Sequence, residues 1–184
     1  MKISQEFVVA RPSGVVWDFF QDVPSVAQCL PGAELAGMDD SGAYQGSLSA
    51  KLGPMTATFE GSASVSADAA SKTASIEGKG VDKRGGSRGQ VKVEYAVIDD
   101  PEGSKVTVDA DVTLSGPAAQ FGRTGLVNEM SKRLINDFVA CLEAKLAAET
   151  EEEAEAVKAT EVKGVSLFFS ALWAWIKGIF GGSN

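Results

Sequence analysis

Histidine, the residue that most often acts as a general base or a metal ligand near neutral pH, does not occur in the 184-residue sequence. A serine or cysteine nucleophile needs a neighbouring base, and the sequence suggests no alternative one. The glycine-rich stretches at residues 78–80 and 85–86 lack the spacing of a phosphate-binding loop, and we interpret them as turns or bulges. These residue types argue against an enzyme.

Two carboxylates and the overall charge bear on metal and nucleic-acid binding. Asp109 and Asp111 share one face of a predicted strand, but the other face is apolar, so exposure of both to solvent is a simpler interpretation than a metal site. The formal net charge is -8, and Lys and Arg do not cluster among aromatic residues. The sequence therefore predicts no nucleic-acid partner.

Cys29 and Cys141 are informative about the redox state of the compartment in which the protein is found. They are far apart in the sequence, they form no C-x-x-C pair, and the N-terminus shows no apolar signal segment. We therefore expect two reduced or buried thiols rather than a disulfide framework, in a reducing cytoplasm.

The N-terminal third predicts one strand and two short helices. Residues 3–9 are expected to form the strand, and Ser13 is the expected N-cap of a helix that reaches Phe20. A second helix is expected over residues 24–30, before Pro31-Gly32 breaks the chain.

The following hundred residues alternate between apolar and polar side chains, which is typical of half-buried strands. Turn sequences at residues 39–42, 84–86 and 99–103 separate the alternating segments. We expect these strands to form an antiparallel meander whose outer face is exposed to solvent. The alternating apolar positions are Ala57, Phe59, Gly61, Ala63 and Val65, then Val91, Val93, Tyr95 and Val97, then Val106, Val108, Ala110, Val112 and Leu114.

From residue 117 to about residue 148 the apolar period becomes helical, which predicts one long amphipathic helix over the sheet. The fold class is therefore α+β, with the ordered domain at residues 1–148. Many inward positions of the sheet are Ala, Gly or Val. Two interpretations stay open: these small residues leave an apolar cavity beneath the helix, or they let the helix pack close to the sheet.

Two further segments follow the domain. Residues 149–163 are acidic and poor in large apolar side chains, which indicates a solvated linker with some helical tendency. Within the last segment, residues 164–184, we expect an amphipathic helix over residues 165–180, which at roughly 24 Å would be too short to span a bilayer core of roughly 30 Å. The residues expected to enter the membrane interface are Leu167, Phe168, Phe169, Leu172, Trp173, Trp175, Ile176, Ile179 and Phe180.

Membrane attachment is one of three interpretations of this last segment. The helix could also fold back onto its own domain or fill a groove on a partner. Its polar face carries one lysine and the linker before it is acidic, so anionic lipid would repel it and attraction must come from apolar burial.

Four short segments resemble one known family. The segments CLPGA at 29–33, LGP at 52–54, GPAAQFG at 116–122 and VWDF at 16–19 occur in the order found in the CoxG family of carbon monoxide dehydrogenase subunits. This family belongs to the START-related, Bet v 1-like (SRPBCC) superfamily. The resemblance implies the helix-grip fold, in which a curved antiparallel sheet surrounds a long C-terminal helix and an apolar cavity.

The resemblance also implies an accessory, non-catalytic role beside a molybdenum-containing carbon monoxide dehydrogenase or a related hydroxylase, peripheral on the inner face of the cell membrane. Related helix-grip proteins bind coenzyme Q, so we expect the cavity to carry a respiratory quinone, menaquinone or ubiquinone, by its isoprenoid tail. Gln120 or Tyr95 is expected to hydrogen-bond a quinone carbonyl. The expected cavity residues are Phe19, Leu30, Phe59, Val93, Tyr95, Val108, Val112, Gln120, Phe121, Val127, Met130 and Leu134.

Two other functions compete with the quinone carrier. A recruitment adaptor would have a filled core and bind no ligand. Its only role would be to attach the dehydrogenase to the bilayer. A cyclase or aromatase, which the same fold supports elsewhere, is disfavoured by the missing histidine and the lack of a polar cluster.

Overall fold

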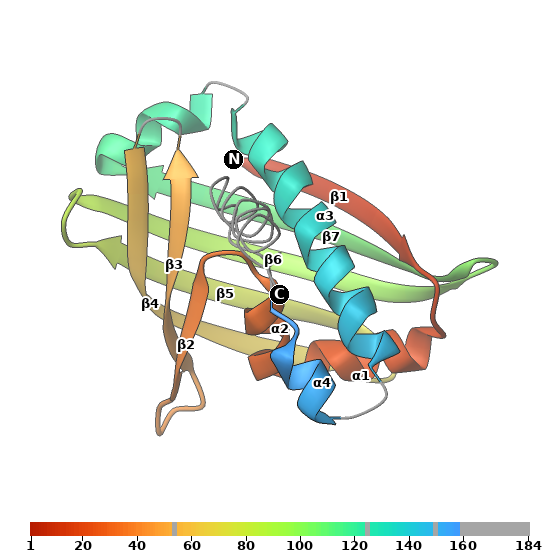
Figure 1. Cartoon of the computed structure of the whole chain (residues 1–184). Helices are drawn as coiled ribbons and strands as arrows, with labels where there is room; N and C mark the ends of the chain where they lie inside the picture. The colour runs from red at the N-terminus through yellow and green to blue at the C-terminus, as the bar shows by residue number, and fades with distance from the viewer. Residues whose placement is uncertain (53–54, 124–125, 149–150, 159–184) are drawn as a thin grey trace, which may run out of the picture.

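The structure is a computed structural model that describes residues 1–52, 55–123, 126–148 and 151–158. The described residues form one antiparallel sheet of seven strands, and the helices lie at its ends and across its inner face (Figure 1). The strands are β1 (Lys2–Val9), β2 (Ala33–Met38), β3 (Tyr44–Leu52), β4 (Met55–Asp68), β5 (Thr73–Asp82), β6 (Ser87–Asp100) and β7 (Gly103–Ser115). The helices are α1 (Ser13–Gln21), α2 (Val23–Cys29), the 3₁₀ helix η1 (Gly116–Arg123), α3 (Leu126–Ala147) and α4 (Glu151–Ala156).

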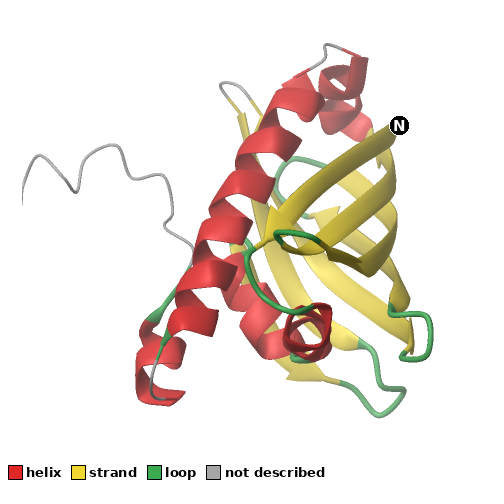
Figure 2. Cartoon of the chain, turned by 90° about the vertical axis from the view of Figure 1, so that its right-hand side faces the viewer, coloured by secondary structure: helices red, strands yellow, loops and turns green. Residues whose placement is uncertain are grey.

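The sheet has the order β1-β7-β6-β5-β4-β3-β2, so each strand from β2 to β7 pairs with its neighbour in sequence, and β1 closes the far edge beside β7. The long helix α3 lies over the β1 end of the sheet (Figures 1 and 2). The predicted α+β helix-grip class and its meander are confirmed, as are the turns at residues 39–42, 84–86 and 99–103.

The first helix differs from its prediction in its cap. Pro12 occupies the N-cap position, and Ser13 is the first helical residue. The hydroxyl of Ser13 donates to Asp99, and Lys72 donates to that hydroxyl at 2.7 Å. Ser13 therefore ties α1 to the end of β6 and to the turn between β4 and β5 instead of capping the helix. In α2, by contrast, Asp22 is a true N-cap that accepts from the amide of Ser25 at 3.3 Å.

The long helix begins later than its sequence period suggests. Gly116 has a positive φ of 73° and ends β7, and the amide of Ala118 donates to the hydroxyl of Ser87 at 3.0 Å. This bond holds residues 116–123 in a 3₁₀ turn beside β6, so the α-helix starts at Leu126 and not at Pro117.

The acidic segment after α3 is in part helical and packed. The buried Lys145 of α3 donates to the side chain of Gln28 and to the carbonyl oxygen of Ala154 in α4, each at 2.7 Å. Burial lowers the pKa of Lys145, while Asp22 and Glu155 oppose the shift. Val157 packs against the core. Through residue 157, this segment is therefore part of the folded domain.

The prediction of two free thiols is wrong. Cys29 at the end of α2 and Cys141 in α3 form a disulfide, with their Cα atoms 5.4 Å apart and both residues almost fully buried. The two cysteines are 112 residues apart in the sequence, but they meet in the fold because α2 and α3 pack side by side. The bridge also removes the argument for a reducing compartment that rested on the cysteines.

We expect the bridge to make a large contribution to stability, because it closes a long loop of the unfolded chain. Replacing both residues, Cys29→Ala with Cys141→Ala, should lower the free energy of unfolding by roughly 2–5 kcal/mol in urea titrations. A reducing agent should destabilise the natural protein by a similar amount and leave the double variant unchanged. Equal stability of the two proteins under oxidising conditions would show that the bridge does not form.

Candidate functional site

Four glycines form a continuous line across the inner face of the sheet. The strand register pairs Gly46 of β3 with Gly61 of β4, Gly61 with Gly80 of β5, and Gly80 with Gly89 of β6. A Cβ at Gly46 or Gly61 would overlap a backbone carbonyl oxygen of the neighbouring strand. Because the space for side chains is taken by backbone, the sheet is sharply bent at this line. As a result β2 and β3 run across the direction of β6 and β7 (Figure 1).

One aromatic side chain covers part of the line. The Cβ of Phe59 lies 3.0 Å from the position of a Cβ at Gly80, and its ring lies 3.5 Å from that position at Gly89. Phe59 joins Ala57, Ala118 and Met130 in a small core cluster at the end of the sheet near η1. This cluster closes one end of the inner face.

A larger core cluster closes the other end. It combines α1, α2 and the second half of α3 with the sheet, and Phe138 and Leu142 are among its members. Between the two clusters the inner face carries half-buried aliphatic side chains that belong to neither. The register places Val91 and Val112 side by side here, with Gly78 as the next neighbour. This middle stretch is the apolar surface on which a long chain of methylenes could lie.

Tyr95 lies where the larger cluster meets the middle stretch. Its side chain packs against the rings of Phe20 and Trp17, at centroid distances of 4.9 and 6.2 Å, and is 5% exposed. Among the described residues, its hydroxyl has no hydrogen-bond partner. Burial raises the pKa of Tyr95, and nearby Gln21 opposes part of this shift, although the Gln21 amide donates to the carbonyl oxygen of Trp17 instead. The phenol therefore stays protonated at neutral pH and is able to donate to a ligand.

A buried hydroxyl without a partner costs free energy, so this one calls for an explanation. Ser104 carries a second such hydroxyl, but it lies at the start of β7, beside Val9 and Asp99. The next inward residue on the strand of Tyr95 is Val93, which belongs to the middle stretch. On β6, Tyr95 is thus the inward-facing polar residue nearest to the candidate ligand surface.

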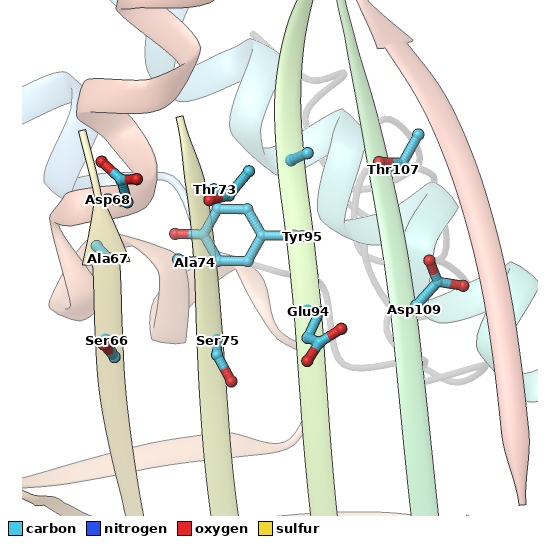
Figure 3. Close-up of a pocket in the computed structure, with 11 residues that line it drawn as sticks. Ser66, Ala67, Asp68, Thr73, Ala74, Ser75, Glu94, Tyr95, Thr107 and Asp109 are labelled. Atoms are coloured by element: carbon cyan, nitrogen blue, oxygen red, sulfur yellow. The ribbon is translucent and has the colours of Figure 1, made fainter. Parts of the chain in front are cut away.

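Two open hollows lie on the outer face of the sheet, and most of the residues that line them are of polar types. The larger, of about 460 Å³, lies over β4–β7 and is lined by residues that include Ser75, Glu94 and Asp109 (Figure 3). The second, of about 340 Å³, includes Glu60 and Lys79. Neither is the apolar cavity that the sequence predicts, so that cavity stays a prediction.

The predicted cavity residues fall into several groups. Phe19, Tyr95, Leu30 and Val108 belong to or pack against the larger cluster, and Phe59 and Met130 to the smaller one. Val93, Val112 and Leu134 are half-buried between them, and Gln120 is exposed on η1. The side chains of Phe121 and Val127, and all nine predicted membrane residues, lie outside the described part of the chain.

Comparison with known families now identifies the chain. The sequence model of the CoxG family, whose members are described as a subunit of carbon monoxide dehydrogenase, matches residues 6–147. The chain belongs to the CoxG family. No curated protein sequence matches it closely enough to add to this.

Solved structures show the fold of this CoxG family member independently. A conserved protein from Geobacillus kaustophilus has a TM-score of 0.64 at 15% identity, over 79% of this chain and 93% of its own. A protein from Thermus thermophilus has a TM-score of 0.59 at 13% identity, over 82% and 100%. Ara h 8.0201 has a TM-score of 0.50 at 14% identity, over 76% and 95%. At such identities the likeness establishes the Bet v 1-like fold alone.

Sequence reasoning missed the glycine line. We interpreted residues 78–80 as a turn or bulge, but Gly78 and Gly80 lie inside β5, with their backbone on the inner face. Their spacing of two matches the period of a strand, which was the available signal. The predicted exposure of Asp109 and Asp111 is confirmed: Asp111 accepts from the N-terminal amine at 3.1 Å and Asp109 from Ser4 at 2.5 Å. Among the described residues no group of acidic or cysteine side chains could hold a metal.

The bend can be tested with one methyl group. Gly61→Ala should destabilise the protein by roughly 1–3 kcal/mol, because the new Cβ overlaps the carbonyl oxygen of Lys79. Gly14→Ala is the matched control: it lies in α1 with open space at its Cβ position, so alanine should be neutral or stabilise by up to about 1 kcal/mol. Urea unfolding measures both variants, and an equal effect of the two would contradict the close approach at Gly61.

Proposed function

We propose that this CoxG family member is a non-catalytic carrier that holds a respiratory quinone, menaquinone or ubiquinone, on the inner face of its sheet. The observation that carries the proposal is the buried hydroxyl of Tyr95, which no described residue satisfies. A quinone carbonyl is an acceptor without a donor of its own, so it complements a protonated phenol. The ligand's isoprenoid tail would then follow Val93 and Val91 toward the glycine line.

The burial of the tail supplies the affinity. Each methylene removed from water contributes roughly 0.8 kcal/mol. The inward residues of the middle stretch are glycine, alanine and valine at Gly78, Ala110, Val91 and Val112, which extend little above the sheet. A long, narrow, flexible ligand suits such a surface better than a rigid polar metabolite does.

The partner follows from the family. A subunit of carbon monoxide dehydrogenase that carries quinone would present it to the molybdenum-containing enzyme, or to a related hydroxylase, as the acceptor of its electrons. The catalytic centre would belong to that enzyme. Because quinones reside in the bilayer, we place the carrier peripherally on the inner face of the cell membrane, held there by residues 164–184 and their apolar arc.

Two structural facts are compatible with this placement. Among the described helices none is long and apolar enough to cross a membrane. The Cys29–Cys141 bridge is almost fully buried, and a disulfide is reduced by direct attack of a thiolate on sulfur. Burial would therefore protect the bridge from cytoplasmic thiols.

The second candidate is a recruitment adaptor that binds no ligand and only brings the dehydrogenase to the bilayer. The observation in its favour is that both hollows described above lie on the outer face of the sheet. In this interpretation the hydroxyl of Tyr95 is satisfied by a trapped water molecule.

Extraction of bound lipid separates the carrier from the adaptor. The full-length protein and a version that ends at Lys158 are exposed to quinone-loaded liposomes, repurified, extracted with organic solvent and analysed by mass spectrometry. The carrier predicts about one quinone per protein in both samples, because the site lies within residues 1–158. No quinone in either sample would favour the adaptor.

Tyr95→Phe tests the hydrogen bond itself. Removing the hydroxyl should weaken quinone binding roughly threefold to tenfold, the value of one hydrogen bond, as measured by fluorescence titration with a short-chain quinone. The same change should leave the free energy of unfolding unchanged or higher, because it deletes a buried group that has no protein partner among the described residues. A loss of stability with unchanged affinity would assign Tyr95 a purely structural role.

A further inference from the structure

The first residue of α1, Ser13, lies at the centre of a polar network that joins three parts of the fold. Ser13 is buried, with an exposed fraction of 3%. Its hydroxyl donates to a carboxylate oxygen of Asp99 at the end of β6, and the ammonium of Lys72 donates to that hydroxyl at 2.7 Å. Lys72 lies in the turn between β4 and β5. We call Lys72, Ser13 and Asp99 the α1 anchor.

Lys72 is held by its backbone as well as by its side chain. Its carbonyl oxygen accepts from the amide of Val97 in β6 at 3.0 Å. Its φ of 49° is the only positive φ at a residue other than glycine in the described part of the chain. A side chain makes this left-handed conformation costly, and residues kept in it cluster at functional sites. In this conformation one residue bonds β6 through its carbonyl oxygen and α1 through its ammonium.

The α1 anchor joins the same two elements that meet around Tyr95. Tyr95 and Asp99 both lie on the inner face of β6, roughly 13 Å apart along the strand. On α1, Trp17 follows Ser13 by one helical turn and Phe20 follows it by two. The rings of Trp17 and Phe20 are the ones that pack against Tyr95. The polar network therefore fixes one end of the contact between α1 and β6, and the aromatic rings continue that contact.

The aromatic contact determines the surroundings of the Tyr95 hydroxyl. Tyr95 is buried, and among the described residues its hydroxyl has no partner. Burial also raises the pKa of Tyr95. A shift of α1 away from β6 would admit water to the phenol. The hydroxyl would then bond water, and it would gain less from an acceptor on a ligand.

We propose that the α1 anchor is a positioning device for Tyr95: it holds Trp17 and Phe20 against the phenol and so keeps water from the hydroxyl. The three residues of the anchor act through α1 and not through contact with a ligand. This inference rests on the proposed function for the identity of that ligand, a quinone. The hydroxyl is dry before the quinone arrives, so no binding free energy is used to displace water from it.

Ionisation of Tyr95 in the full-length protein tests the anchor without any ligand. The chain has two tyrosines, so a Tyr44→Phe background leaves only Tyr95, and its phenolate absorbance against pH gives its pKa. Asp99→Ala should lower the pKa of Tyr95 toward its usual value, because water reaches the phenol once α1 is released. Asp99→Asn removes the same charge but keeps an oxygen that accepts from Ser13. It should therefore keep the raised pKa, which separates positioning from a direct effect of the carboxylate.

The same proteins are then titrated with a short-chain quinone. Asp99→Ala should bind it severalfold more weakly than the Tyr44→Phe protein, and Asp99→Asn should bind it as that protein does. The matched control is Asp39→Ala, which removes a carboxylate and its hydrogen bonds from the turn between β2 and β3. This control should lower stability without changing the pKa of Tyr95 or the affinity. Urea unfolding confirms that each variant is folded.

The outcomes separate this inference from the carrier function. An unchanged pKa of Tyr95 in Asp99→Ala, or an equal change in Asp99→Asn, would overturn the inference and leave the carrier intact. A lowered pKa with unchanged quinone affinity would overturn it too, because the anchor would then be purely structural. A lowered pKa in a protein whose natural form binds no quinone would refute the carrier and support the hold of the anchor on Tyr95.

Discussion

The close approach of neighbouring backbones at Gly46 and Gly61 determines the shape of the domain. Where the carbonyl oxygens of adjacent strands occupy the space of a side chain, no residue larger than glycine fits without straightening the sheet. The bend lets β2 and β3 run across the direction of β6 and β7 (Figure 1). The inner face thereby acquires two walls, one beneath α3 and one formed by β2 and β3. The candidate ligand surface lies between them.

The division also explains why the core is split. Helices α1 and α2 and the second half of α3 bring aromatic rings to one end, where Phe20 lies 5.7 Å from Phe138 between ring centroids. At the other end η1 supplies Ala118 to a second, smaller cluster. The sheet between them presents small, half-buried inward side chains, among them Val91 and Val112. The two clusters therefore anchor the two ends of the inner face and leave its middle to these smaller residues.

Much of the fold could be predicted from the sequence, because strand alternation and helical period are local signals. They placed the strands and the long helix, whose buried side chains include Phe138, Cys141 and Leu142. The disulfide and the glycine line could not be predicted in this way. Both depend on which residues of different strands and helices become neighbours in the fold. The spacing of residues along the sequence specifies neither the strand register nor the packing of helices. The spacing of Gly78 and Gly80 fits a turn as well as a strand until β4 and β6 are in place.

The sequence predicted the type of residue in the candidate site better than it predicted the contacts of each residue. Side-chain chemistry suggested Tyr95 as a hydrogen-bond donor to a quinone. Only the packing of Phe20 and Trp17 around its ring shows why its hydroxyl lacks a partner among the described residues. Gln120, suggested with it, is exposed on η1, where water satisfies an amide without a ligand. The difference is one of desolvation: a donor in water gains little from a ligand carbonyl, whereas a buried donor without a partner gains nearly a full hydrogen bond.

Charge imposes the remaining constraint on how such a protein meets a membrane. The net charge is -8, and Glu152 and Glu155 are exposed on α4, next to the point where the last segment begins. An anionic lipid surface repels this region, so contact with a bilayer has to depend on apolar side chains alone. Apolar side chains that are sufficient for that purpose are also a liability in water, where they promote self-association.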